Sequence, residues 1–239
     1  MCKAKSAHSG VAMIELIFAI VIMGIVMMSA PMLVSRASNA GLLTVQQEAI
    51  VAGSSEIGMI LTRQWDENNT KESLYSPVLM TSEDIDSLNE ATDADGNYTG
   101  RRAGTPSLST RSFLTSDGKR LEASSTLGSD GDDDDIDDFN NHTATLTSSD
   151  TTTAQVGDYI DTSLQLLTTL KYISSPSNYN ATTISFNTPF NTTPVGTSNI
   201  KAIKTVITSG SHDADFGTKI KLRAFSCNIG TYELIERSF

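Results

Sequence analysis

The sequence predicts an α+β fold in which a long N-terminal helix packs on a C-terminal antiparallel β-sheet. Three observations lead to this prediction. The first is an uninterrupted apolar stretch from Val11 to Val34. The second is a helical repeat of apolar residues that continues to about Trp65, and the third is an alternation of apolar and polar residues after Val156.

The apolar stretch is long enough to cross a membrane. The 20 residues between Glu15 and Arg36 carry no charge, and a spanning helix needs about 20 mainly apolar residues. We therefore expect residues 11–34 to be the transmembrane half of the helix. Residues 1–10 are basic and contain no acidic residue. Basic flanks stay on the cytoplasmic side, so the rest of the chain is expected on the opposite side.

Glu15 places a carboxylate inside this apolar stretch. Insertion scales assign an acidic residue roughly 2.5–3.5 kcal/mol at the middle of a spanning helix, and less near its end. We expect this cost to be offset by a cation from another chain. The alternative is an ordinary signal anchor in which the glutamate has no role.

Residues 9–16, which contain Gly10, Val11 and Glu15, resemble the class III signal of type IV pilins and pseudopilins. That signal has a short basic leader, a glycine, an apolar residue and a glutamate at the fifth mature position. The resemblance implies a pilin fold, cleavage after Gly10 by prepilin peptidase, and N-methylation of Val11. It also implies that Glu15 accepts the new amino group of a neighbouring subunit during assembly. Val11 and Ala12 depart from the residues usual in major pilins, which favours a minor subunit.

Two further segments resemble minor pseudopilins of mannose-sensitive haemagglutinin pilus systems. They are Trp65-Asp66-Glu67-Asn68 and Asp134-Asp135-Ile136-Asp137-Asp138-Phe139. The resemblance implies a structural subunit of a type IV pilus or of a type II secretion-like filament. The implied partners are the prepilin peptidase and methyltransferase, other pilins or pseudopilins, an inner-membrane assembly platform and membrane lipid. The implied location is the inner membrane with a periplasmic ectodomain, and later a pilus or pseudopilus.

Residues 35–66 are expected to form the amphipathic half of the helix. Leu43, Ile50, Ile57 and Leu61 repeat at helical spacing, with Ala49 and Ile60 beside them, and predict one apolar stripe. This stripe is expected to support the globular domain.

Residues 67–155 are polar and acidic, and we expect them to form mainly loops, including 93–112. An acidic run inside this region is a candidate calcium site, because hard cations prefer several carboxylate oxygens. The alternative is a solvated loop. The candidate ligands are Asp132, Asp133, Asp134, Asp135, Asp137 and Asp138.

Residues 156–239 alternate as half-buried strands do, and we expect them to form the sheet. The clearest strand is Ile220–Ser226, where apolar and basic residues alternate. The other candidates are Ile160–Tyr172, Thr183–Phe186, Ile200–Thr208 and Tyr232–Ile235. The first of these ranges also fits a helix, and the family resemblance implies that it is a strand.

The composition argues against several other functions. The net charge of −11 disfavours nucleic-acid binding. The three histidines have no nucleophile or metal spacing beside them, so we do not expect an enzyme or a cofactor other than calcium. The alternative to a filament subunit is a membrane-anchored adhesive or binding ectodomain, with or without a dependence on calcium.

Overall fold

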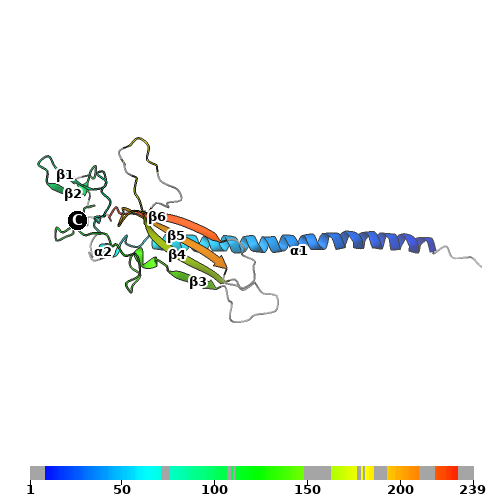
Figure 1. Ribbon diagram of the computed structural model, residues 1–239. Helices are drawn as coiled ribbons and strands as arrows, with labels where there is room; N and C mark the ends of the chain where they lie inside the picture. The colour runs from blue at the N-terminus through cyan, green and yellow to red at the C-terminus, as the bar shows by residue number, and fades with distance from the viewer. Residues whose placement is uncertain are drawn as a thin grey trace, which may run out of the picture. The chain divides into compact units, whose positions relative to one another are not determined.

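The computed structural model describes residues 9–70, 76–106, 109, 111–147, 163–176, 179, 181–185, 193–209 and 219–230, and only the backbone of residues 9–12. The chain divides into two compact units, Met1–Glu48 and Ala49–Phe239. The long helix α1 (Ser9–Ile60) supplies the first unit and continues into the second (Figure 1).

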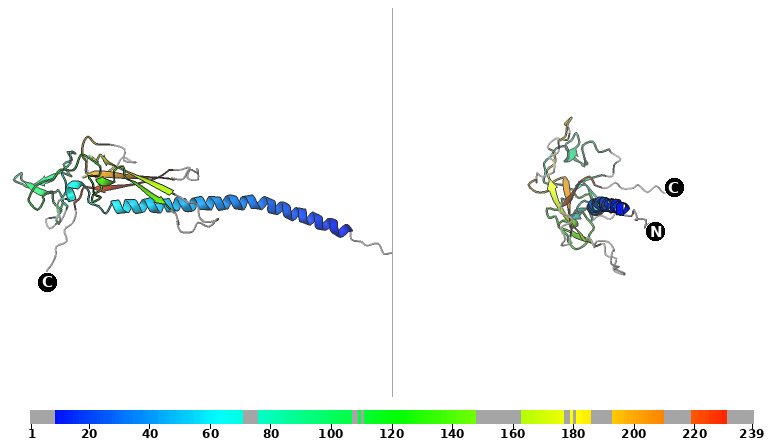
Figure 2. Two further views of the ribbon diagram at one scale, coloured as in Figure 1. Left: turned by 90° about the horizontal axis from the view of Figure 1, so that it is seen from below. Right: turned by 90° about the vertical axis from the view of Figure 1, so that its right-hand side faces the viewer.

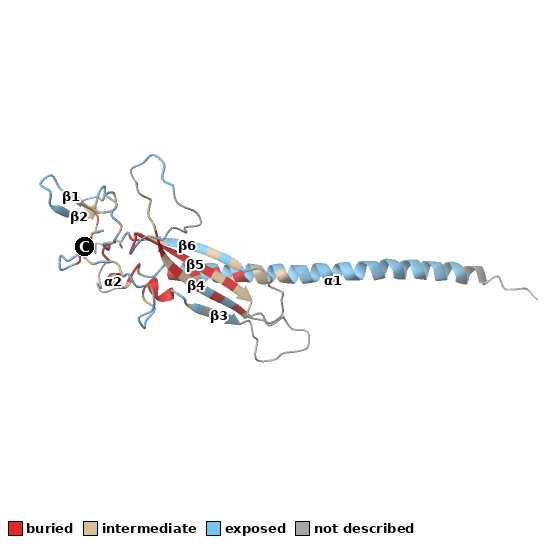
Figure 3. Cartoon of the chain, viewed as in Figure 1, coloured by how far each residue is buried: buried red, intermediate tan, exposed pale blue. Residues whose placement is uncertain are grey.

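Within the first unit, α1 is an apolar helix, and most of its residues from Met13 onward are exposed (Figure 3). It continues through Pro31, and it confirms the predicted helix as far as Ile60. Among the described residues, one helix, Met13–Ile60, is long and apolar enough to cross a membrane. Beyond Ile60 the chain tightens into a turn, in which the Arg63 N–H donates to the Ile60 carbonyl at 3.1 Å.

The part of α1 in the second unit buries one side of the apolar stripe that the sequence predicted. Of the predicted stripe, Ala49, Ile57 and Ile60 are buried, whereas Leu43, Ile50 and Leu61 are exposed. The buried face consists of Ala49, Gly53, Ile57 and Ile60.

The packing around Gly53 shows why part of this buried face carries small residues. A Cβ atom at Gly53 would lie 2.6 Å from Ile207 Cδ1 and 2.8 Å from Leu222 Cδ1. The absence of a side chain therefore lets the helix approach the sheet closely.

The second unit contains a four-stranded antiparallel sheet with the order β3-β4-β5-β6. Its strands are β3 (Thr143–Thr147), β4 (Ser163–Ile173), β5 (Ile200–Ser209) and β6 (Ile220–Cys227). Figure 2 shows these strands beside the C-terminal part of α1, which agrees with the close approach at Gly53. The long N-terminal helix followed by an antiparallel sheet confirms the α+β class.

Three of the five predicted strands are present, one is absent over its described residues, and one lies outside the described part of the chain. Strands β4, β5 and β6 correspond to the predicted ranges 160–172, 200–208 and 220–226. Residues 183–185 form no strand, whereas Phe186, Ile160 and the predicted strand 232–235 lie outside the described residues.

The region 67–155 contains more regular structure than its composition predicted. It starts with a short helix, α2 (Glu67–Thr70), and its segment 143–147 is the edge strand β3, so the sheet begins before residue 156. The expected loop 93–112 contains β2 (Tyr98–Arg102), which pairs with β1 (Glu90–Thr92) in a separate two-stranded hairpin. The turn between them is fixed by the Asp93 carboxylate, which accepts the Asn97 N–H at 2.8 Å.

The core of the second unit lies between the end of α1, the sheet and the one-turn 3-10 helix η1 (Asp137–Phe139). Burial is concentrated on β4 and β5 in Figure 3. The buried members of this core are Ile57, Ile60, Trp65, Leu79, Ile136, Phe139, Leu170, Tyr172 and Ile203.

Candidate functional sites

The first candidate site is the beginning of α1. The backbone of Gly10 and Val11 is helical, and Glu15 lies one turn further on with its side chain exposed. Its neighbours Ile14 and Leu16 are more than half exposed. A carboxylate on an otherwise apolar helical surface therefore faces outward, where another chain could reach it.

The acidic run is divided by the fold. Asp132 and Asp133 are exposed and Asp134 is half-buried, whereas Asp135, Asp137 and Asp138 are buried. The predicted ligands therefore point into different environments. The carboxylate oxygens of Asp130, Asp132 and Asp138 do lie within 4.8 Å of one another. Calcium binding remains a prediction.

Asp135 and Asp138 organise the turn that leads into η1. Asp138 Oδ2 accepts the backbone N–H groups of Asp134 and Asp135, each at 3.1 Å. In return, the Asp138 N–H donates to Asp135 Oδ1 at 3.1 Å. This reciprocal capping explains why acidic side chains are buried here, because backbone donors stabilise carboxylates.

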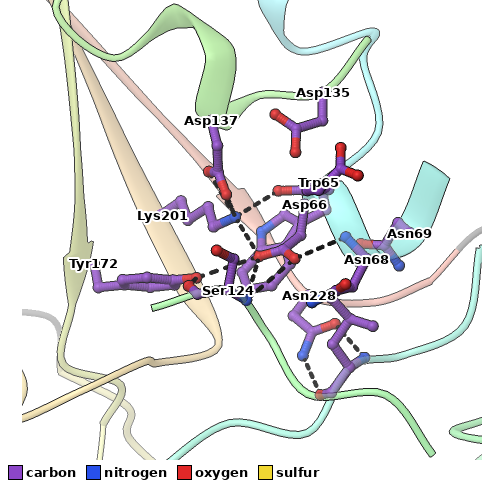
Figure 4. Close-up of polar contacts among 12 residues, drawn as sticks. Trp65, Asp66, Asn68, Asn69, Ser124, Asp135, Asp137, Tyr172, Lys201 and Asn228 are labelled. Atoms are coloured by element: carbon purple, nitrogen blue, oxygen red, sulfur yellow. Dashed lines mark hydrogen bonds and ion pairs between the residues drawn. The ribbon is translucent and has the colours of Figure 1, made fainter. Parts of the chain in front are cut away.

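The second candidate site is a buried ionic cluster that the sequence did not predict. We call it the Lys201 cluster, and it consists of Trp65, Asp66, Asp137, Tyr172 and Lys201 (Figure 4). The Lys201 ammonium donates to the Trp65 carbonyl at 2.7 Å, to Asp66 Oδ2 at 2.9 Å and to Asp137 Oδ2 at 2.8 Å. Its Nζ also lies 2.7 Å from Asp137 Oδ1. The three donors of the ammonium are thus fully used.

Aromatic rings enclose this ammonium. The Lys201 Nζ lies 4.0 Å from the centroid of the Trp65 ring and 5.3 Å from that of Tyr172. The side chain of Lys201 is 0% exposed, and those of Asp66 and Asp137 are 0% and 3% exposed. Water is therefore excluded from the ion pairs, and their interactions are stronger than at the surface.

Asp66 is held by several donors besides Lys201. The Ser124 N–H donates to Asp66 Oδ2 at 3.0 Å, and the Asn68 N–H donates to Asp66 Oδ1 at 3.1 Å. The Tyr172 hydroxyl, which donates to the Ser124 carbonyl at 2.6 Å, lies 3.3 Å from Asp66 Oδ2. These donors hold the Asp66 carboxyl group in place.

The buried carboxyl groups outnumber the buried ammonium. Burial raises the pKa of Asp137 to about 7, although Lys201 opposes this shift. Burial also raises the pKa of Asp135 to about 7. For the Tyr172 hydroxyl, burial and the nearby carboxylates raise the pKa, so it remains a hydrogen-bond donor.

The strand register contains the signal that could have revealed Lys201. Tyr172 lies on the buried face of β4, and Lys201 is its direct partner on β5. Lys201 therefore shares the inward face with Ile203, Thr205 and Ile207, all of which are buried. A lysine on the buried face of a sheet needs an acidic partner, and the acidic run could have supplied that partner.

Comparisons of the chain with protein-family models, with curated proteins and with solved structures give no match.

Proposed function

We propose that this protein is a pilin-like minor subunit of an envelope-spanning filament, anchored in the membrane by α1 until assembly. The observation that carries the proposal is the position of Glu15. It follows the Gly10–Val11 bond by four residues and lies exposed on an apolar helix, before 20 uncharged residues. A carboxylate in that position is costly in lipid and is stabilised by a neighbouring cation.

Cleavage after Gly10 would create such a cation. The new α-amino group at Val11 stays positively charged after N-methylation. At contact distance and an effective dielectric constant of about 20, an ion pair gains about 4 kcal/mol before desolvation. Pairing Glu15 of one copy with Val11 of the next is a heterologous contact, and repetition of such contacts generates helical filaments.

The two-part character of α1 is consistent with this role. Its apolar first part has the length and composition of a membrane span. Its last turns bury Ala49, Gly53, Ile57 and Ile60 in the second unit. One helix thus combines an apolar assembly surface with the attachment of a folded ectodomain.

The experiment separates processing from assembly in the native host. Gly10→Ala is expected to leave an uncleaved precursor in the membrane. Glu15→Ala is expected to be cleaved normally but to be lost from the sheared filament fraction. Glu48→Ala is the matched control, because Glu48 is an exposed acidic residue on the same helix. Normal incorporation of Glu15→Ala into filaments would refute the proposed pairing.

A further inference from the structure

The Lys201 cluster has the composition and geometry of a condensation site. A primary amine and two carboxyl groups meet in a volume lined by Trp65 and Tyr172 and closed to solvent. Nζ of Lys201 lies within 2.8 Å of both carboxyl oxygens of Asp137. The amine nitrogen therefore faces the carboxyl group as a whole, including the carbon to which both oxygens are bonded.

We propose that Lys201 and Asp137 condense to form an intramolecular amide bond, with Asp66 transferring the protons. The bond would join β5 covalently to η1. Its two residues, Lys201 and Asp137, are separated by 64 positions in the chain. This inference concerns the second unit alone and does not depend on the proposed filament function.

The two aspartates differ in a way that assigns their roles. Asp66 receives N–H donors from Ser124 and Asn68 in addition to Lys201, so its carboxyl group is held in a fixed position. Among the described residues, Asp137 has Lys201 as the one donor to its carboxyl oxygens. Burial raises the pKa of the Asp137 carboxyl to about 7, which makes its neutral, electrophilic form accessible. Asp137 is therefore the acyl donor, and Asp66 is the proton-transferring carboxylate.

The chemical step balances without a co-reactant. A low-dielectric interior disfavours charged groups, so transfer of one proton converts the ion pair into a neutral amine and a carboxylic acid. The Nζ lone pair attacks Cγ of Asp137 and forms the C–N bond. Asp66 accepts a proton from Nζ and delivers it to the departing hydroxyl group, and the C–O bond breaks. One water molecule leaves, and Asp66 returns to its starting state.

The orientation of the reactants lowers the barrier to the reaction. Holding two groups in contact converts a bimolecular step into a unimolecular one, with effective molarities on the order of 10⁵ M or more. The same burial that brings the groups together excludes the water that would hydrolyse the product.

Peptide mapping of the purified full-length chain tests the proposal. After denaturation, trypsin cuts the unlinked chain after Arg120, Lys171 and Lys201. An amide at Lys201 blocks that cut. Mass spectrometry should then find one branched peptide that joins residues 121–171 to residues 172–204, lighter than the sum of its parts by one water molecule. Recovery of residues 121–171 and 172–201 as linear peptides alone would overturn the proposal. A branch to residues 64–71, which contain Asp66, would overturn the assignment of Asp137.

Variants identify the reacting groups. Lys201→Arg keeps a cation but removes the amine, and is expected to abolish the branched peptide. Lys204→Arg is the matched control, because Lys204 is exposed on the same strand, and it should retain the branch. Asp66→Asn is expected to leave the linear peptides predominant, as the proton-transferring group is lost. A branched peptide at wild-type yield in folded Asp66→Asn protein would overturn the role of Asp66. The wild-type digest decides on the bond itself, even if a variant fails to fold.

Discussion

Nζ of Lys201 lies 2.9 Å from Oδ2 of Asp66, and both side chains are completely buried. The contact connects β5 to the segment that follows α1. Asp66 lies in this segment, six positions after the last residue of the helix. Through Asp137, the same ammonium also connects η1 to the sheet. Three segments far apart in the sequence thus meet at one cation.

Removal of this cation should destabilise the second unit strongly. In Lys201→Met, Asp66 and Asp137 would remain buried without their ammonium partner. Breaking a buried ion pair from one side costs about 3–5 kcal/mol. Thermal unfolding of the full chain in detergent should show a large loss of stability. Lys204→Met, at an exposed position of β5, should change stability by about 0.5 kcal/mol or less. Equal effects of the two substitutions would show that the cluster does not stabilise the fold.

Asp135 should make stability fall as the pH rises. Its pKa is raised from 3.8 to about 7 by burial. Between these values the folded chain keeps a proton that the unfolded chain has lost. The contribution of Asp135 is therefore most favourable below about pH 4 and declines until about pH 7. A shift of about three units corresponds to an upper limit of about 4 kcal/mol.

The substitution Asp135→Asn isolates this effect. The difference in unfolding free energy between the variant and the wild type should move in favour of the variant as the pH rises from 4 to 7. Asp133→Asn is the control, because Asp133 is exposed in the same segment, and its difference should vary much less over that range. A pH-independent difference for Asp135→Asn would contradict the raised pKa.

Two glycines of α1 should respond in opposite directions to substitution. No atom lies within 4 Å of the position that a Cβ would take at Gly58, so Gly58→Ala should stabilise the helix by up to about 1 kcal/mol. Gly53→Leu would overlap with Ile207 and Leu222, and should cost about 1–3 kcal/mol. Thermal unfolding of both variants measures the contrast. A stabilising Gly53→Leu substitution would contradict the close packing of α1 on the sheet.

Arg102 should be irreplaceable by lysine. Its guanidinium donates to the Leu88 carbonyl at 2.8 Å, the Asn228 carbonyl at 2.6 Å and Asn199 Oδ1 at 2.6 Å. Burial lowers its pKa to about 10, so it remains charged at neutral pH. A lysine ammonium cannot reproduce this planar fork.

Arg102→Lys is therefore expected to cost about 1–3 kcal/mol, because buried acceptors lose their donors. The control is Arg111→Lys at an exposed position, which should be close to neutral. Unfolding in denaturant gives both values, and indistinguishable midpoints would contradict the anchoring role of Arg102.

The sequence predicted those elements in which a pattern of apolar residues lies within one continuous segment. The apolar first part of α1 and the alternating strands β5 and β6 were identified in this way, whereas for β4 a helix also fitted the pattern and the family resemblance favoured the strand. Strand β3 was missed because Thr143–Thr147 is dominated by threonine and lies in a polar region. The buried face of α1 was predicted in part: Ala49, Ile57 and Ile60 are buried, but the close-packing position Gly53 carries no hydrophobic signal.

The Lys201 cluster could not be predicted from local patterns. Its members are brought together by the pairing of β4 with β5 and by the packing of η1 on the sheet. The acidic run predicted an ion site, but its composition did not show that Asp137 faces a lysine of the same chain. The predicted assembly residues Gly10, Val11 and Glu15 were assigned to a contact between chains, and a single chain cannot show such a contact.

The most direct test of the proposed function is the mass-spectrometric identification of the N-terminus in protein isolated from its native membrane. The account predicts a mature chain that begins with N-methylated Val11. A chain that begins at Met1, or one that is cut at any bond other than Gly10–Val11, would contradict it.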